Sequence, residues 1–79
     1  MSMKDDQIQQ AIAQATEGKQ QVTWEEISAA VKAAGTIAKN GWGRVRGNLQ
    51  YFINKGYLLR NTADIRGPEL YNVLKALPQ

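Results

Sequence analysis

Residues 40–57 read NGWGRVRGNLQYFINKGY, and this stretch decides how the rest of the 79-residue chain is organised. At helical spacing its apolar side chains fall on one face. Gly56 follows at the point where a glycine in the left-handed conformation commonly ends a helix. The sequence therefore predicts a helix at about residues 41–55 with one side in the core. The core-facing residues are Trp42, Val45, Leu49, Phe52 and Ile53.

The opposite face of this helix is polar and partly bare. Two of its residues, Gly43 and Gly47, should each cost about 1 kcal/mol relative to alanine in a helix. One interpretation is that the backbone approaches a flat or convex partner while Arg44 and Arg46 reach phosphates or guanine edges. The other is structural: Gly41 and Gly43 shape the helix entrance, and Gly47 admits another part of the same chain. The other residues of this face are Gln50, Tyr51 and Asn54.

Composition limits the chain to one small domain and argues against catalysis on chemical grounds. A chain of this length buries only about 60% of its unfolded surface, so we expect one domain, residues 1–79. There is no cysteine and no histidine, which removes the commonest nucleophiles, general bases and metal ligands. We therefore predict no enzymatic activity, no cofactor and no metal.

The beginning of the chain and its hydropathy give no sign of a membrane protein. No apolar run approaches the roughly 20 residues of a membrane span. The opening MSMKDDQIQQ lacks the basic and apolar regions of a signal peptide. We expect a cytoplasmic protein without membrane contact.

Charge is distributed unevenly along the chain. Residues 1–35 hold three lysines against five carboxylates, a net charge of −2. Residues 36–66 hold four arginines and two lysines against one carboxylate, a net charge of +5. Such a basic segment is typical of a surface that binds a polyanion, although solvated charge on a small domain produces a similar pattern.

Two further helices are predicted before the central one. Apolar residues at i, i+3, i+4 and i+7 predict a helix at about residues 4–16, closed by Gly18. Thr23 and Glu26 form a capping box, in which each side chain accepts from the other residue's backbone amide. This motif predicts the start of a second helix, at about residues 23–34.

The connecting and C-terminal segments predict a hairpin. Gln20–Val22 reads as a short link with at most a residue or two of strand, and Asn40 is expected to cap the third helix. Residues 57–61 and 69–74 read as two short strands separated by a turn-rich loop. The sequence thus predicts an α+β fold of three helices followed by a β-hairpin.

This order resembles the winged helix-turn-helix family of DNA-binding domains. The resemblance rests on LQYFINKGYLLRN, where an apolar helix runs through a Lys-Gly step into a strand, followed by ELYNVL. It covers about residues 4–75. The chain departs from the family in the connection between the second and third helices, which is longer than the usual tight turn.

The resemblance implies which residues contact DNA. In this family the third helix usually enters the major groove, and the hairpin loop, or wing, lies along the backbone or minor groove. Carried over, the groove-facing candidates are Arg44, Gly47, Gln50, Tyr51 and Asn54. Lys39, Arg46 and Arg60 would lie near phosphates, and Arg66 at the wing tip. The full predicted DNA-binding set is Lys39, Asn40, Arg44, Arg46, Gly47, Gln50, Tyr51, Asn54, Arg60 and Arg66.

The leading hypothesis is therefore a small double-stranded DNA-binding regulator that acts by occupying its site. Dimerisation or a protein partner is compatible with this hypothesis, and compact regulators of this kind are frequent in phages and prophages. The alternative is a winged-helix protein-interaction module without DNA binding, using a patch around Trp24, Tyr51 and Tyr57, because fold alone does not decide function. RNA binding ranks third, since the chain lacks an aromatic stacking platform.

Overall fold

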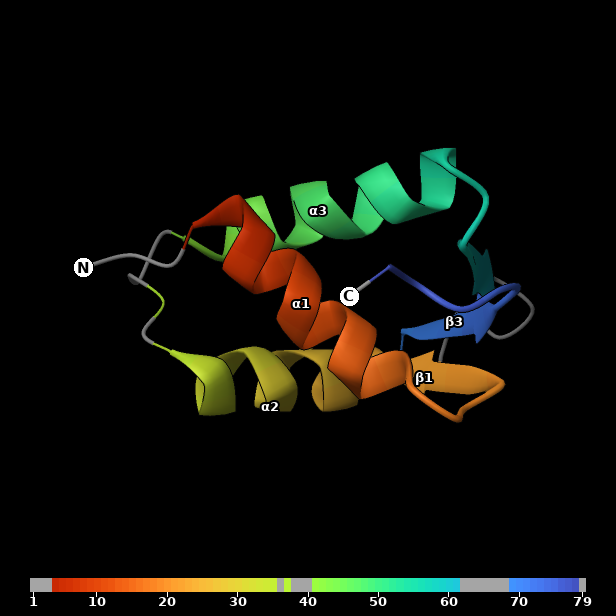
Figure 1. Cartoon of the computed structure of the whole chain (residues 1–79), viewed down its shortest axis with the longest axis horizontal. Coiled ribbons are helices and arrows are strands. Elements are labelled where there is room, and N and C mark those ends of the chain that lie inside the picture. Colours follow the sequence, from red (N-terminus) through yellow and green to blue (C-terminus); the bar gives the residue numbers. More distant parts are fainter. Residues whose placement is uncertain (1–3, 36, 38–40, 62–68, 79) are drawn as a thin grey trace.

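The three helices and a small antiparallel sheet form an α+β arrangement (Figure 1). The computed structural model describes residues 4–35, 37, 41–61 and 69–78. Strand β3 lies in the centre of the sheet, with the order β1-β3-β2. In Figure 1, α1 crosses in front of α2 and α3, and the sheet lies at one end of the helices. The elements are α1 (Asp5–Thr16), β1 (Gln21–Thr23), α2 (Trp24–Ala34), α3 (Trp42–Asn54), β2 (Leu58–Asn61) and β3 (Leu70–Val73).

Local capping signals fix the ends of the first two helices. The predicted capping box is confirmed: the Glu26 amide donates to Thr23 Oγ1 at 3.1 Å, and the Thr23 amide donates to Glu26 Oε1 at 3.1 Å. At the end of α1, Gly18 adopts a φ of +73°, which favours glycine. α2 therefore begins directly after β1, with Thr23 as its N-cap residue.

The C-terminus of α3 is closed by the predicted Gly56. This glycine has a φ of +85°. Its amide donates to the Ile53 carbonyl, and the Tyr57 amide donates to the Phe52 carbonyl, both at 3.0 Å. This pair of bonds is a Schellman motif, and the Tyr57 ring packs against the edge of Phe52 with centroids 5.8 Å apart. The motif leads the chain straight from α3 into β2.

The start of α3 differs from the expectation. Gly41 occupies the N-cap position and makes no side-chain capping hydrogen bond. The prediction that Asn40 caps this helix is therefore wrong by one position, because the first helical residue is Trp42. Asn40 itself lies outside the described residues.

The sheet contains one strand more than the predicted hairpin. The segment expected to be mostly a link contributes β1, in which Val22 pairs with Tyr71 of β3. On the other side of β3, Leu58 of β2 pairs with Val73. A two-stranded hairpin is marginally stable alone, whereas a sheet of three strands with one apolar face buried is more stable. Val22, Leu58 and Tyr71 are all buried on that face.

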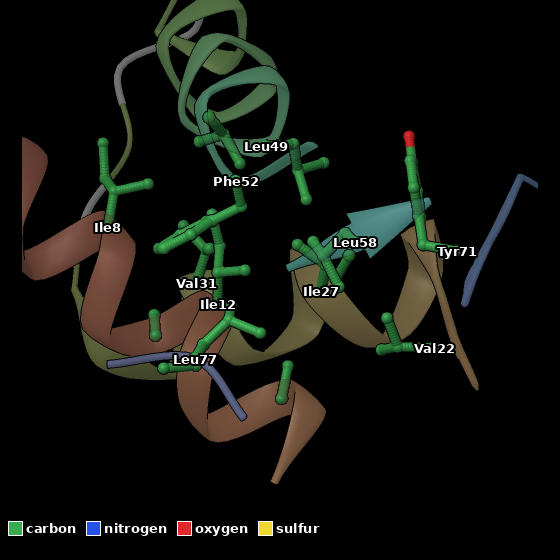
Figure 2. Packing of buried hydrophobic residues seen from close by; sticks show 14 residues of the cluster. Ile8, Ile12, Val22, Ile27, Val31, Leu49, Phe52, Leu58, Tyr71 and Leu77 are labelled. Atoms are coloured by element: carbon green, nitrogen blue, oxygen red, sulfur yellow. The ribbon is translucent and has the colours of Figure 1, made fainter. Parts of the chain in front are cut away.

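The core lies between the three helices and this buried face of the sheet (Figure 2). Each helix supplies branched or aromatic side chains, and Leu77, beyond β3, belongs to the same cluster. The largest fully buried side chains are Ile8, Ile12, Val22, Ile27, Val31, Val45, Leu49, Phe52 and Leu58. This core holds α3 against α1 and the sheet with one face turned outward.

The predicted α+β class is confirmed, and the order of helices and hairpin is broadly compatible with a winged helix. The third helix spans 42–54, against the predicted 41–55, and the hairpin strands span 58–61 and 70–73. Within the described part of the chain, no helix is both long and apolar enough to cross a membrane.

Candidate nucleic-acid interface

The face of α3 opposite the core is exposed along its whole length. Gly43, Gly47, Gln50 and Asn54 recur at i, i+4, i+7 and i+11, so they form one line along the helix. We call these four residues the outward stripe. All four are exposed, and in Figure 1 no other element lies above α3 on the outer edge of the molecule. In the second half of the stripe, the Gln50 side-chain amide donates to Asn54 Oδ1 at 2.9 Å. The first half is bare because Gly43 and Gly47 have no side chains.

The described residues do not explain why the outward stripe has glycine at positions 43 and 47. Neither has a positive φ, so neither needs the conformational freedom of glycine. A Cβ atom added at Gly43 or Gly47 would meet nothing within 4 Å. The interpretation that Gly47 admits another part of the same chain is therefore wrong for the part of the chain described.

We expect the substitution Gly43→Ala to stabilise the protein. Alanine restricts the unfolded chain and suits a helix, and its methyl group would enter open space, so the free energy of unfolding should rise by about 0.5–1 kcal/mol. Urea denaturation of the parent and the variant measures this difference. As a control, Gly56→Ala should destabilise, because Gly56 has a φ of +85°. A destabilised Gly43→Ala variant would show that the fold requires the glycine.

One edge of the outward stripe is held against α1 by a polar network. Arg44 Nη2 lies 2.8 Å from Asp5 Oδ1, and Arg44 Nε donates to the same oxygen at 3.2 Å. The buried Asn48 donates to the Arg44 carbonyl at 2.9 Å and accepts from Gln9 Nε2 at 2.8 Å. Hydrogen bonds from Arg44 and Asn48 lower the pKa of Asp5. Asp5, in the first turn of α1 where a carboxylate suits the helix dipole, thus also orients Arg44.

The other edge of the outward stripe is held against the sheet by Glu69. Arg46 donates to Glu69 through Nη1 at 3.0 Å, and its Nη2 lies 3.0 Å from the second carboxylate oxygen. Arg60 Nη2 and the Tyr71 hydroxyl donate to Glu69 Oε1 at 2.7 Å and 3.0 Å. The Arg46 guanidinium also stacks on Trp24, with Cζ 4.1 Å from the ring centroid. We call Arg46, Arg60, Glu69 and Tyr71 the Glu69 cluster.

The ionisation of the Glu69 cluster follows from these contacts. The hydrogen bond from Arg46 is the main cause that lowers the pKa of Glu69, and burial opposes it. The same bond raises the pKa of Arg46. Burial, followed by the hydrogen bond to Glu69, raises the pKa of Tyr71. At neutral pH the cluster therefore holds two guanidinium groups, one carboxylate and a neutral phenol.

Acid should weaken the fold partly through Glu69. Because the pKa of Glu69 is lower in the folded protein, its contribution to stability is present above the unfolded pKa. The contribution is lost as the pH falls through the folded value. We expect the free energy of unfolding to fall between about pH 6 and about pH 3, and to fall less in Glu69→Gln. Urea denaturation across this range measures both slopes, with Glu17→Gln as a control. Equal slopes in the parent and Glu69→Gln would exclude Glu69 as a contributor.

The aromatic residues predicted to form one protein-binding patch lie at two ends of α3. Trp24 packs at the first turns, against Trp42 with ring centroids 5.9 Å apart. Tyr51 is 46% exposed and makes a T-shaped contact with Phe52, which makes a second T-shaped contact with Tyr57. Trp42 and Tyr51 are separated by about 14 Å along the helix axis. Trp24 therefore lies near the start of α3, whereas Tyr51 and Tyr57 lie near its end.

The structure brings together six of the ten predicted DNA-binding residues on α3, where Arg44, Arg46, Gly47, Gln50, Tyr51 and Asn54 are all exposed. Arg60 lies on β2 and joins Arg46 through Glu69. Lys39, Asn40 and Arg66 lie outside the described residues. The roles of Glu69 and Asn48 could not be predicted from the sequence, since their partners Arg46 and Gln9 lie far along the chain. Among the described residues, no three acidic side chains gather in a group that could hold a metal ion.

Comparisons with protein-family models, with curated proteins and with solved structures found no match to this chain.

Proposed function

We propose that this chain is a small double-stranded DNA-binding regulator that places the outward stripe of α3 in the major groove. The observation that carries the proposal is the bare, uncovered stripe, whose Gly43 and Gly47 face open space. The major groove is about 12 Å wide and admits an α-helix. Without side chains at these two positions, the backbone of α3 can approach the floor of the groove closely.

The flanks of the outward stripe supply the positive charge that such docking requires. Arg44 and Arg46 lie on its two edges, and about half of each side chain is exposed. Exposed ion pairs contribute little, so exchanging Asp5 for a phosphate or a guanine edge would cost Arg44 little. Gln50 and Asn54 supply amides of the kind that pair with adenine in the groove.

A titration of isotope-labelled protein with a mixed-sequence DNA duplex tests the proposal. We expect backbone amide shifts at the outward stripe that shrink as salt rises, because phosphate contacts release counterions. An RNA duplex of the same sequence is a matched control, since its deep, narrow major groove does not admit a helix. Equal shifts with RNA would mean that the protein responds only to the charge of the duplex and that α3 does not enter the major groove. Absence of shifts at low salt would contradict DNA binding.

A substitution of Arg44 distinguishes a contact with a base from a contact with a phosphate. If Arg44 contacts a guanine, Arg44→Ala should weaken the preferred site by about 1–3 kcal/mol and weaken other sequences much less. Binding of a labelled duplex, selected from a random pool, measures the difference. The control is Lys19→Ala, beyond the C-terminal end of α1, which removes one positive charge that pairs with Glu26 and not with a residue of α3. Equal losses on all sequences would assign Arg44 to a phosphate.

A protein partner is the second candidate function, and the outer face of the sheet favours it. Leu59 and Leu74 are 51% and 56% exposed. Leu59 pairs with Asn72 on β3, and Leu74 follows two residues beyond, so both leucines lie on the same face. Salt separates the two functions, because docking on leucines should respond far less to salt than phosphate contacts do.

A further inference from the structure

A hollow of about 310 Å³ lies between α2 and the first turns of α3, beside the outward stripe. Its lining comes from Trp24, Ser28 and Lys32 of α2 and from Trp42 and Arg46 of α3. Both tryptophans of the chain therefore line this hollow. We call it the tryptophan hollow.

The side chains of the tryptophan hollow suit an anion. Lys32 Nζ lies 5.6 Å from the centroid of Trp42, and Arg46 Cζ lies 4.1 Å from that of Trp24. Ammonium, guanidinium and indole groups are hydrogen-bond donors without acceptor capacity. The Ser28 hydroxyl, which can also accept, donates to the Glu25 carbonyl at 3.0 Å. The lining is thus cationic and donor-rich, with aromatic walls.

The neighbouring acid does not cancel this charge. Glu69 takes two of the five N–H donors of Arg46 and is shared with Arg60 and Tyr71. The lining of the hollow itself contains two cations, Lys32 and Arg46, and no carboxylate. Arg46 therefore has further N–H groups that can donate hydrogen bonds to a second anion.

We propose that the tryptophan hollow receives a backbone phosphate of the DNA strand that borders the groove. This inference rests on the proposed docking of α3. Arg46 borders the outward stripe on the side of α2, so a groove centred on the stripe would place one of its phosphate walls over this edge. Charge complementarity selects the phosphate, and Lys32 and Arg46 would hold it from the two sides of the hollow.

The inference is tested by the salt dependence of duplex binding in two variants with the same charge change. Lys32→Gln removes one of the two cations of the hollow, whereas Lys75→Gln removes a cation near Tyr57, at the other end of α3. A labelled duplex of about 20 base pairs is bound at several salt concentrations. We expect Lys32→Gln to weaken binding severalfold and to reduce the slope of log K against log salt by about 0.9. Lys75→Gln should change both quantities much less.

Tryptophan fluorescence gives a second, local signal, since both emitters line the hollow. We expect the duplex to change the emission of the parent more than that of Lys32→Gln. Two results would overturn the inference: a Lys32→Gln variant that binds like Lys75→Gln, or a decaglutamate peptide that changes the emission more than the duplex does. The latter would assign the hollow to an acidic protein segment.

The inference and the proposed function fail in different ways. Duplex-induced amide shifts at the outward stripe, together with an unaltered salt slope in Lys32→Gln, would reject the hollow as a phosphate site and retain DNA binding by α3. A lowered slope in Lys32→Gln, with no shifts at Gly43 or Gly47, would keep the phosphate site and reject docking of α3. A parent protein that ignores the duplex at low salt would reject both.

Discussion

Replacing Gly47 with leucine is expected to make the protein more stable and, at the same time, to weaken duplex binding at least tenfold. The stability should rise by about 0.8 kcal/mol, because leucine is a far better helix former than glycine. A Cβ atom at this position meets nothing within 4 Å, so the new side chain would start in open space.

The loss of binding has a separate cause. In the proposed complex, Gly47 lies in the middle of the outward stripe, where the backbone of α3 approaches the bases. A leucine side chain would hold the helix away from the groove floor and stretch the contacts of Arg44 and Arg46. A tenfold loss corresponds to about 1.4 kcal/mol, which is less than one good base contact can supply.

Two measurements on one set of variants test the prediction. Urea denaturation gives the stability, and anisotropy of a labelled duplex gives the affinity, for the parent, Gly47→Ala and Gly47→Leu. Affinity should fall with side-chain size while stability stays above that of the parent. Gln10→Leu, on an exposed position of α1, controls for an added surface leucine. Unchanged affinity in Gly47→Leu would remove the outward stripe from the interface.

Those parts of the fold that depend on residues close together in the sequence could be predicted. Thr23 and Glu26 lie three positions apart, so their capping box could be recognised without knowledge of the fold. Gly56 likewise ends α3 through bonds to residues one turn earlier. The amphipathic pattern of α3 also placed Arg44, Arg46, Gly47 and the amides correctly on the exposed face.

Pairings between distant residues could not be predicted in this way. β1 is stabilised by β3, and Val22 pairs with Tyr71 almost fifty positions later. The partners of Arg46 and Arg44, Glu69 and Asp5, are 23 and 39 residues away in sequence. Arg44, Arg46 and Arg60, the predicted arginines that the structure describes, each have an acidic partner, which the uneven charge distribution did not reveal. Such partners decide how readily each arginine can contact an external anion.

The second large effect is expected from Glu69→Gln, which should destabilise the fold and strengthen duplex binding. The carboxylate accepts hydrogen bonds from Arg46, Arg60 and the Tyr71 hydroxyl. Hydrogen bonds to charged groups contribute about 1.5–3 kcal/mol, but the Glu69 side chain is 25% exposed, so we expect a loss of about 1 kcal/mol. A glutamine retains one acceptor oxygen and the shape of the side chain.

Binding should change in the opposite direction because the two arginines lose their anionic partner. The charge of the Glu69 cluster rises from +1 to +2, and a guanidinium group released from the carboxylate can contact a phosphate. One added phosphate contact steepens the slope of log K against log salt by about 0.9. We therefore expect a several-fold higher affinity at low salt and a smaller gain at high salt.

Glu17→Gln is the matched control, since it produces the same change in net charge on an exposed position at the end of α1. The salt slope of this control should remain close to that of the parent. Equal gains in the two variants would mean that net charge alone raises the affinity, and that Glu69 does not restrain Arg46 and Arg60. A weaker complex in Glu69→Gln would mean that DNA binding needs these arginines held in place by Glu69. Either result would contradict the competition between carboxylate and phosphate on which this prediction rests.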